Sequence, residues 1–356
     1  MIKKSLAVLL ALAMLFALAA CGENGATGSG TETTTSHIRE IKTKVAALNG
    51  PTGLGLAKLA VDRAYAYDVQ YYSDPQEVAP LLTTGEIDIA ALPINLAANL
   101  YNKTKGGIQI LAINTLGVLH VIENGNSIKS IADLKGKTVY ATGQGSTPEY
   151  IINYVLEQNG LDPEKDVDIQ YKAAHSELAT LAVEGKADIC ILPEPFATKV
   201  IAQTNMVETT AASEEASQQA EATTAAEDKI TLRRALDLTT EWDKVCDVQL
   251  VQGCVVARTE YINQNPEIVK EFMSFNEVSV NYLNSNGEGA GVFLIENGYF
   301  DNTSIAVSTI KNSNLVFIEG EEMKTAAKQV FEILHQANPA SVGGAIPDDG
   351  IYYVAA

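Results

Sequence analysis

The sequence predicts an α/β protein made of two similar, doubly wound lobes, and two observations support this prediction. The chain has 356 residues, of which 46% are hydrophobic, so it is long enough to bury two cores. A short motif occurs twice, as GEIDIAALP at 85–93 and as GKADICILP at 185–193. This spacing is far too long for a solenoid repeat, so the repeat indicates two related α/β units.

The repeated motif predicts the end of a helix, a buried strand and a loop. In the first copy, an apolar helical stretch at 78–82 precedes Gly85, which suits the position after a helix, where φ is positive. The run 87–92 is short, apolar and bounded by turn residues, as a buried strand is, and Pro93 ends it. The second copy gives the same elements at 178–183, Gly185, 187–192 and Pro193.

A strand, a glycine-rich loop and a helix precede the motif in each half. In the first half, KVAAL at 44–48 leads into the loop NGPTGLG and an apolar-periodic helix through Ala64. In the second half, KTVYA at 137–141 leads into the loop TGQGSTP and a helix over 149–158. Strands that alternate with helices in this way indicate a parallel sheet with crossover helices.

Apolar runs join the two halves. The run 111–123 has room for two strands before the break at 124–126, and 248–257 is a further strand-like run. From Pro266 the chain is helical and has no glycine-rich unit of its own, so we expect it to return to the first lobe. Two crossings would form a two-stranded hinge, which allows closure around a ligand. The expected boundaries are 39–123 and 248–356 for lobe 1, 127–247 for lobe 2, and 121–126 and 249–252 for the crossings.

Lobe 2 contains a low-complexity insertion at 207–229. Between Val207 and Lys229 the chain is mainly Ala, Thr, Ser, Gln and Glu, with no large apolar residue and no aromatic residue. Such a segment cannot bury apolar surface, so we predict a solvated insertion, with a short exposed helix as the alternative. Its acidic side chains indicate a solvated face rather than a metal site.

The N-terminus has the features of a targeting segment. A positive start at 1–4 and an apolar run at 5–16 predict a signal peptide at 1–20; an uncleaved anchor is the alternative. The ending LAAC resembles the bacterial lipobox, in which the cysteine, here Cys21, is lipidated and becomes the first mature residue. Small polar residues follow, so we expect a lipid-anchored, flexible tether at 21–38.

Charge, cysteines and motif absences exclude several function classes. The net charge is −19 and no basic stretch follows the first four residues, which argues against nucleic-acid binding. A small anionic ligand remains possible, because backbone N–H groups bind anions without Lys or Arg. Cys190, Cys246 and Cys254 read as buried free thiols, with a Cys246–Cys254 disulfide as the alternative. HExxH and GxSxG are absent, so we expect no enzyme, no metal and no cofactor.

Ligands of open α/β sheets bind beyond the carboxyl ends of the strands, where we expect four loops of this chain. Glycines let the backbone approach a ligand, and a following helix offers free N–H groups to an anion or a carbonyl. Hydroxyl side chains add hydrogen bonds, with helix capping as their alternative role. The candidate ligand-binding residues are Gly50, Thr52, Gly53, Asn95, Asn114, Gly145, Ser146, Thr147 and Glu194.

Glu194 stands between two prolines, which hold it rigidly. A carboxylate there favours a ligand with N–H donors or a positive charge, unless an anionic end sits on the glycine loops. A contact between lobes or a helix cap is the alternative role of Glu194. The hinge side offers further polar or buried candidates: Thr115, His120, Gln252 and Cys254.

The motifs together resemble bacterial ABC-transporter substrate-binding lipoproteins. The similarity rests on the lipobox, the two lobes, and the sequences GPTG, DLKGK, GQGSTPEY and LPEPFA in this order, and it covers 42–353 apart from the insertion. The branch it resembles takes nitrate, taurine, aliphatic sulfonates and thiamine-pyrimidine precursors. The resemblance implies a type II periplasmic-binding-protein-like fold with a ligand between the lobes.

The resemblance also implies a function. We expect an extracytoplasmic solute-binding lipoprotein of an ABC importer, anchored to the cell membrane by a lipid such as palmitate on Cys21. It would capture a sulfonate, nitrate or pyrimidine-precursor-like solute and deliver it, as a monomer, to a membrane permease. The alternative is a sensory or scaffold lipoprotein that uses the same cleft to signal through a membrane partner.

Overall fold

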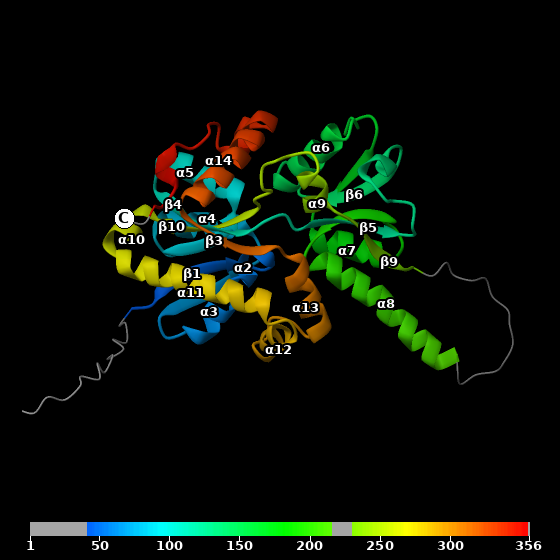
Figure 1. Cartoon of the computed structure of the whole chain (residues 1–356), viewed down its shortest axis with the longest axis horizontal. Coiled ribbons are helices and arrows are strands. Elements are labelled where there is room, and N and C mark those ends of the chain that lie inside the picture. Colours follow the sequence, from blue (N-terminus) through cyan, green and yellow to red (C-terminus); the bar gives the residue numbers. More distant parts are fainter. Residues whose placement is uncertain (1–40, 216–229, 355–356) are drawn as a thin grey trace, which may run out of the picture. The chain divides into compact units, whose positions relative to one another are not determined.

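The computed structural model describes residues 41–215 and 230–354 (Figure 1). The predicted signal peptide and tether, with Cys21, and residues 216–229 of the predicted insertion lie outside the described residues. The described chain contains two sheets with helices against both faces of each, which confirms the two-lobed α/β prediction. No helix among the described residues is long and apolar enough to cross a membrane.

The first sheet has the strand order β11-β4-β10-β3-β1-β2. β1 pairs in parallel with β2 and β3, whereas β10 is antiparallel to β3 and β4, and β11 is antiparallel to β4. The parallel pairing of β1, β2 and β3 is as predicted, and the sheet as a whole is mixed because the C-terminal part inserts β10 between strands of the first half. The strands are β1 Thr43–Leu48, β2 Tyr67–Tyr72, β3 Ile89–Pro93, β4 Ile108–Thr115, β10 Gly253–Arg258 and β11 Leu315–Ile318.

The second sheet repeats this plan with the order β7-β6-β8-β5-β9. β6 is parallel to β7 and β8, and β5 is antiparallel to β8 and β9. β5 thus holds in the second lobe the place that β10 holds in the first. The strands are β5 Leu119–Asn124, β6 Thr138–Thr142, β7 Asp168–Lys172, β8 Ile189–Pro193 and β9 Leu232–Asp237.

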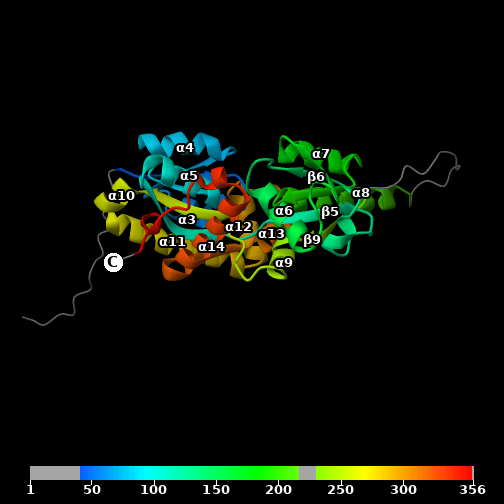
Figure 2. The same cartoon turned by 90° about the horizontal axis from the view of Figure 1, so that it is seen from above.

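Apolar helix faces cover each sheet. In the first lobe, α4, α5 and α14 pack on one face and α3, α10 and α11 on the other. Their bounds are α3 Ala57–Asp62, α4 Pro75–Thr84, α5 Ile94–Thr104, α10 Thr259–Gln264, α11 Pro266–Ser285 and α14 Gly320–Ala337. In the second lobe, α6 and α9 cover one face and α7 and α8 the other. Their bounds are α6 Thr147–Gln158, α7 His175–Val183, α8 Phe196–Glu215 and α9 Leu238–Asp243. α4 and α7, the corresponding helices of the two lobes, lie on the same side in Figure 2.

The remaining helices are short or belong to the C-terminal part. α12 and α13 pack against each other and, with α2 and α11, form a further apolar cluster. Their bounds, with those of the 3-10 helices, are α2 Pro51–Leu54, α12 Glu288–Glu296, α13 Thr303–Asn312, η1 Ile131–Leu134, η2 Pro339–Val342 and η3 Asp349–Ile351.

The repeated motif folds as predicted. Gly85 follows α4 with φ 80°, and Gly185 follows α7 with φ 69°, the positive values that favour glycine after a helix. β3 and β8 are buried strands, and each ends at the proline of the motif. The turn chemistry and the apolar runs were therefore sufficient signals for these elements.

The predicted position of the first crossing is wrong. The chain leaves the first sheet after Thr115 and enters the second at Leu119, so β5 belongs to the second lobe and the boundary does not lie at 123. The crossing, Leu116 to Val118, is itself apolar and differs little in composition from the strands. The more polar break at 124–126 is a turn inside the second lobe.

The second crossing runs irregularly through the predicted 249–252 and reaches β10 at Gly253. Gln252 joins the two crossings: its N–H donates to the Thr115 carbonyl (3.1 Å), and its side-chain oxygen accepts from the Val118 N–H (2.7 Å). Its own carbonyl accepts from the N–H of Ile94 (3.0 Å). Neither crossing is a β-strand, so the two connections are held by these hydrogen bonds rather than by a ladder.

Two further expectations have an outcome. α8 continues to Glu215, so 207–215 adopt the helical alternative for the start of the predicted insertion. Cys190, Cys246 and Cys254 are free thiols; the first and last are buried and Cys246 is half-buried.

Candidate functional site

A cleft of about 790 Å³ lies where the strands of both sheets end. Its walls follow β1 and β2 in the first lobe and β6, β7 and β8 in the second. The carboxyl ends of parallel strands from two sheets thus meet around one space, which is where ligands of open α/β sheets bind. The volume is within the range of small-molecule sites.

The corresponding helices α4 and α7 both start at the cleft, and they differ in their caps. α4 is capped by Asp74, whose Oδ1 accepts from the Gln76 N–H (2.8 Å). The matching residue of α7, 100 positions later, is Ala174, and no side chain caps that helix. The first N–H groups of a helix have no partner within it and attract anions. The start of α7 is therefore an uncapped donor site at the cleft, where His175 and Ser176 line the wall.

A neutral histidine stands at this uncapped end. His175 Nδ1 lies 2.6 Å from Thr142 Oγ1, at the end of β6, and its ring centroid lies 5.5 Å from that of Phe196. Burial lowers the pKa of His175 below its ordinary value, so the ring is uncharged at pH 7. His175 thus offers hydrogen bonding and an apolar face to a solute, but no charge.

Aromatic rings form a further part of the cleft wall. Tyr71 and Tyr299 meet edge to face, with ring centroids 5.5 Å apart and hydroxyl oxygens 3.2 Å apart. Phe300 and Phe196 also line the cleft, and all four rings are half-buried. Burial raises the pKa of Tyr71, so its hydroxyl stays protonated. Such a wall suits the apolar body of a ligand.

Few charges line the cleft, and one buried hydroxyl has no partner. Among the described lining residues, the carboxylate is that of Asp74, which caps α4, and the ammonium is that of Lys199 on α8, 5.9 Å from the Phe300 ring centroid. Thr309 on α13 is 1% exposed, and its Oγ1 makes no hydrogen bond within the described residues. A buried hydroxyl without a partner is costly, so a bound solute that pairs with it gains affinity.

The first glycine loop reaches the cleft only in part. Gly50, with φ 126°, lines it. Gly53 does not: a Cβ there would lie 2.1 Å from the Leu48 carbonyl oxygen, so glycine is needed for packing of α2 on β1. Thr52 and Asn114 bond to each other, since Asn114 Nδ2 donates to the Thr52 carbonyl (2.7 Å).

The polar groups of the second glycine loop are largely used in hydrogen bonds to nearby residues of the chain. Gly143, not Gly145, lines the cleft. The Gly145 N–H donates to Glu149 Oε2 (2.6 Å), and Ser146 Oγ donates to the Gly143 carbonyl (2.6 Å). Neither Ser146 nor Thr147 caps α6 through its hydroxyl, contrary to the alternative role expected for them. Thr147 is buried away from the cleft lining.

The other two candidates also lie outside the cleft lining. Asn95 is in the first turn of α5. Glu194 is fully buried and pairs with Arg234; its Oε2 accepts from the Thr198 N–H in the first turn of α8 (3.3 Å). Glu194 therefore has the helix-end contact that was its alternative role.

Sequence reasoning missed most of the lining residues, among them Tyr71, Asp74, His175, Phe196, Lys199, Tyr299, Phe300 and Thr309. The 100-residue repeat held a signal for some of them, because 71–75 and 171–175 span the end of the corresponding strand and the start of the next helix in each lobe. The C-terminal residues gave no such signal.

Comparison with known proteins agrees with the fold. Residues 57–242, just over half of the chain, match the family model described as "ABC transporter, phosphonate, periplasmic substrate-binding protein". The chain belongs to this family. The family consists of transport substrate-binding proteins, not enzymes, and its members work outside the cytoplasmic membrane. Comparison with curated protein sequences finds no significant match.

Solved structures of ABC-transporter proteins share the fold. An ABC transporter from Parabacteroides distasonis aligns with a TM-score of 0.69 and 22% identity over 88% of this chain and 99% of its own. The aliphatic sulphonate binding protein SsuA from Escherichia coli aligns with 0.62 and 16%, over 87% and 95%. The nitrate-binding protein NrtA from Synechocystis aligns with 0.55 and 14%, over 85% and 84%. These matches confirm the periplasmic-binding-protein-like fold.

No group of three His, Cys, Asp or Glu residues in the described ranges 41–215 and 230–354 could hold a metal ion. The cleft instead offers helix N–H groups, hydroxyls and aromatic rings. Its chemistry is that of solute recognition by hydrogen bonds and stacking.

Proposed function

We propose that this substrate-binding protein captures a small organic anion in the cleft between its sheets. The anionic end sits on the uncapped start of α7, and the body of the solute lies against the aromatic wall of Tyr71, Tyr299, Phe300 and Phe196. The single observation that carries the proposal is the missing cap: Asp74 closes α4, and Ala174 leaves α7 open. The partnerless hydroxyl of Thr309 supplies a further donor at the cleft.

The size and lining of the cleft narrow the solute class. About 790 Å³ is far more than a nitrate ion fills, and the aromatic wall gains nothing from a bare inorganic anion. An alkyl or aryl sulfonate, a phosphonate, or a phosphorylated pyrimidine-like ring has both an anionic end and an apolar body. The neutral state of His175 is compatible with an anion held by N–H dipoles rather than by an opposite charge.

The direct test is calorimetric titration of the full chain, after unfolding and refolding to remove carried-over solute. The panel holds sulfonates and phosphonates of increasing chain length, phosphorylated pyrimidines, nitrate, and an uncharged alcohol as a matched control. We expect one organic anion to bind, and nitrate and the alcohol not to bind. Binding of the alcohol as strongly as its sulfonate would contradict the anion-end assignment.

Thr309→Val keeps the shape of the side chain and removes the hydroxyl. We expect about tenfold weaker binding of the panel hit, the scale of one hydrogen bond to a charged group. Thr303→Val, at the first residue of the same helix and outside the cleft lining, is the control. Equal affinities for the two variants would remove Thr309 from the site.

We further propose that the protein is held at the membrane by a lipid on Cys21 and passes its solute to an ABC permease. The LAAC sequence and the polar stretch after it support the anchor. Membrane fractionation with mass spectrometry of the N-terminal peptide tests it: the native chain should carry acyl groups at Cys21, and Cys21→Ser should be released. An unmodified Cys21 in the membrane fraction would contradict the anchor.

A further inference from the structure

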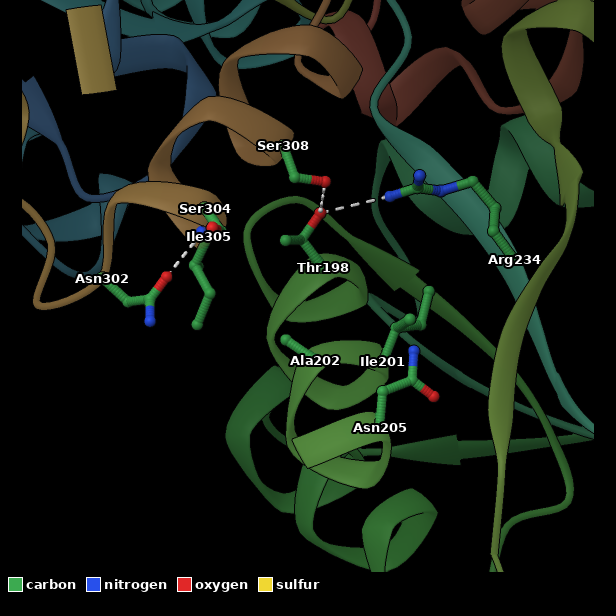
Figure 3. A pocket seen from close by; sticks show the side chains of 9 residues that line it. All are labelled: Thr198, Ile201, Ala202, Asn205, Arg234, Asn302, Ser304, Ile305 and Ser308. Carbon is green, nitrogen blue, oxygen red and sulfur yellow. Dashed lines mark hydrogen bonds between the residues drawn. The ribbon is translucent and has the colours of Figure 1, made fainter. Parts of the chain in front are cut away.

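α13 belongs to the C-terminal part and leads into β11 of the first sheet, yet it packs on α8 of the second lobe. A groove of about 430 Å³ runs along this contact, with α8 and β9 on one side and α13 on the other (Figure 3). α13 therefore touches the second lobe without being one of the two chain crossings.

A partly buried polar cluster of the second lobe lies behind this contact. Its members, named here the polar cluster, are His120, Glu194, Thr198, Arg234 and Asp237. Thr198 Oγ1 donates to Glu194 Oε1 (3.0 Å) and accepts from Arg234 Nη2 (3.3 Å), which also pairs with Glu194. His120 Nε2 lies 3.6 Å from Glu194 Oε1, and its Nδ1 lies 3.7 Å from Asp237 Oδ2.

Burial sets the protonation of the cluster. Burial raises the pKa of Glu194 to about 7, although Arg234 and Thr198 oppose the rise. Burial, and then the charge of Arg234, lower the pKa of His120 to about 4, so this ring is neutral at pH 7. The side chains of His120 and Glu194 are fully buried.

The first lobe shows what the fold itself requires at these positions. The strand registers and the 100-residue repeat match each member of the polar cluster to one residue of the first lobe. The five counterparts are all apolar and fully buried in its core: Cys254, Ile94, Ala98, Ile110 and Ile113. The architecture is therefore satisfied by an apolar core, and the second lobe buries charges where the first does not. Buried ion pairs are weak evidence for stability, so the polar cluster calls for another role.

α13 meets the polar cluster at two points one helical turn apart. Ser308 Oγ lies 3.4 Å from Thr198 Oγ1, and the Asn312 carbonyl lies 3.4 Å from His120 Nε2. In Figure 3, Ser308 and Arg234 both point toward the Thr198 hydroxyl, Ser308 from α13 and Arg234 from β9. Asn312 Nδ2 also donates to the Ser308 carbonyl (2.6 Å), which ties the two contact points together.

We propose that α13 is a latch between the lobes, and that its two contacts with the polar cluster set how far the cleft opens. Ser308 is the neighbour of the cleft residue Thr309, so a change in the latch moves a cleft wall. The members of the cluster act as positioning residues for closure. The latch is independent of which solute the cleft takes.

The test measures the distance between the lobes in the full chain without solute. Spin labels are placed at the exposed positions Lys103 and Glu164, in a background with Cys21 and Cys246 replaced by serine. Ser308→Ala removes one latch contact. Ser304→Ala, one turn earlier on α13 and without a contact to Thr198, is the matched control. We expect Ser308→Ala to raise the population with the longer distance about two- to tenfold, the scale of one hydrogen bond, and the control to match the native chain.

A second variant replaces four members of the polar cluster by apolar residues, as at the matching positions of the first lobe: His120→Val/Glu194→Ile/Thr198→Ala/Arg234→Ile. We expect it to melt no lower than the native chain, since an apolar replacement of a buried ion pair is often neutral or stabilising, and yet to open more. Unfolding of this variant would show that the cluster is structural, against the proposal. If the distances between the spin labels in Ser308→Ala equal those in the native chain, the latch proposal is wrong. This outcome does not depend on which solute the calorimetric panel identifies.

Discussion

The two lobes share one plan and differ in which polar groups they place at the cleft and in the core. In the first lobe Asp74 closes the helix that faces the cleft, and the core behind the strands is apolar. In the second lobe Ala174 leaves the matching helix open, and the polar cluster occupies five positions that are apolar in the first lobe, beside an apolar core under α7 and α8. A duplicated architecture thus shows which features the fold needs and which serve a function. The open start of α7 and the polar cluster that α13 contacts are both features of the second lobe.

The largest effect should come from breaking the buried ion pair. Arg234→Ile leaves Glu194 without its partner in a fully buried site, so we expect a loss of about 3–5 kcal/mol in the free energy of unfolding. The double variant Arg234→Ile/Glu194→Ile should recover most of this loss, because both positions then resemble the first lobe. Denaturant unfolding measures both.

The control for this comparison is Arg258→Met in the first lobe, which breaks a partly exposed pair with Asp88. We expect a loss of about 1 kcal/mol there. Equal losses in the two lobes would mean that burial does not distinguish the two pairs.

Lowering the pH should increase the difference between the lobes, because the second lobe buries His120 where the first lobe has Cys254. The pKa of His120 is lowered from 6.5 to about 4, so the unfolded chain binds the proton first as the pH falls. The stability that His120 contributes is complete above about 6.5 and declines toward pH 4, by up to about 3 kcal/mol.

His120→Val should lose less stability than the native chain between pH 6.5 and 4. Glu194 acts in the opposite direction, since its raised pKa makes the fold lose stability as the pH rises from 4.5 to about 7. It is present in both proteins, so the difference between their unfolding curves reports His120. Parallel curves for the two proteins over this range would mean that His120 protonates normally in the fold.

Replacing a glycine by alanine should lower the stability of the protein by different amounts in the two glycine loops. Gly53→Ala places a Cβ against the Leu48 carbonyl, and we expect a loss of about 2–3 kcal/mol. Gly145→Ala meets open space, so the positive φ of 73° alone should cost about 1 kcal/mol. Thermal unfolding compares them; a smaller loss for Gly53→Ala than for Gly145→Ala would contradict the packing account.

The sequence was enough for the local part of the fold. The repeat, the glycines at 85 and 185, and the two proline-ended strands followed from apolar runs and turn chemistry. The first crossing was placed wrongly because Leu116, Gly117 and Val118 differ little from the strands on either side. Only pairing of β5 with β8 and β9 shows that β5 is in the second lobe.

The candidate site was harder to predict, because its walls come from distant parts of the chain. Tyr299 and Thr309 reach the cleft from the C-terminal part, and no local pattern marks them. Glu194 was recognised as a rigid polar residue, but its partner Arg234 comes from another strand and is not visible in the local sequence. Gly53 was predicted to lie at the ligand, whereas the structure gives packing against Leu48 as the reason for glycine at this position.

Exchanging the two caps has the smallest expected effect on stability. Ala174→Asp gives α7 the cap that α4 has, and Asp74→Ala removes the cap of α4. We expect a gain and a loss of about 1 kcal/mol, respectively. Thermal unfolding checks both directions. A loss on Ala174→Asp would show that the start of α7 does not accept a cap.

The most direct test of the account is calorimetric binding of the organic anion found in the panel to these same two variants. A carboxylate at 174 occupies the N–H groups of α7 and repels the anionic end of the solute, so Ala174→Asp should bind at least tenfold more weakly. Asp74→Ala should bind as tightly as the native chain or more tightly. Undiminished binding by Ala174→Asp would contradict the claim that the open helix of the second lobe holds the solute.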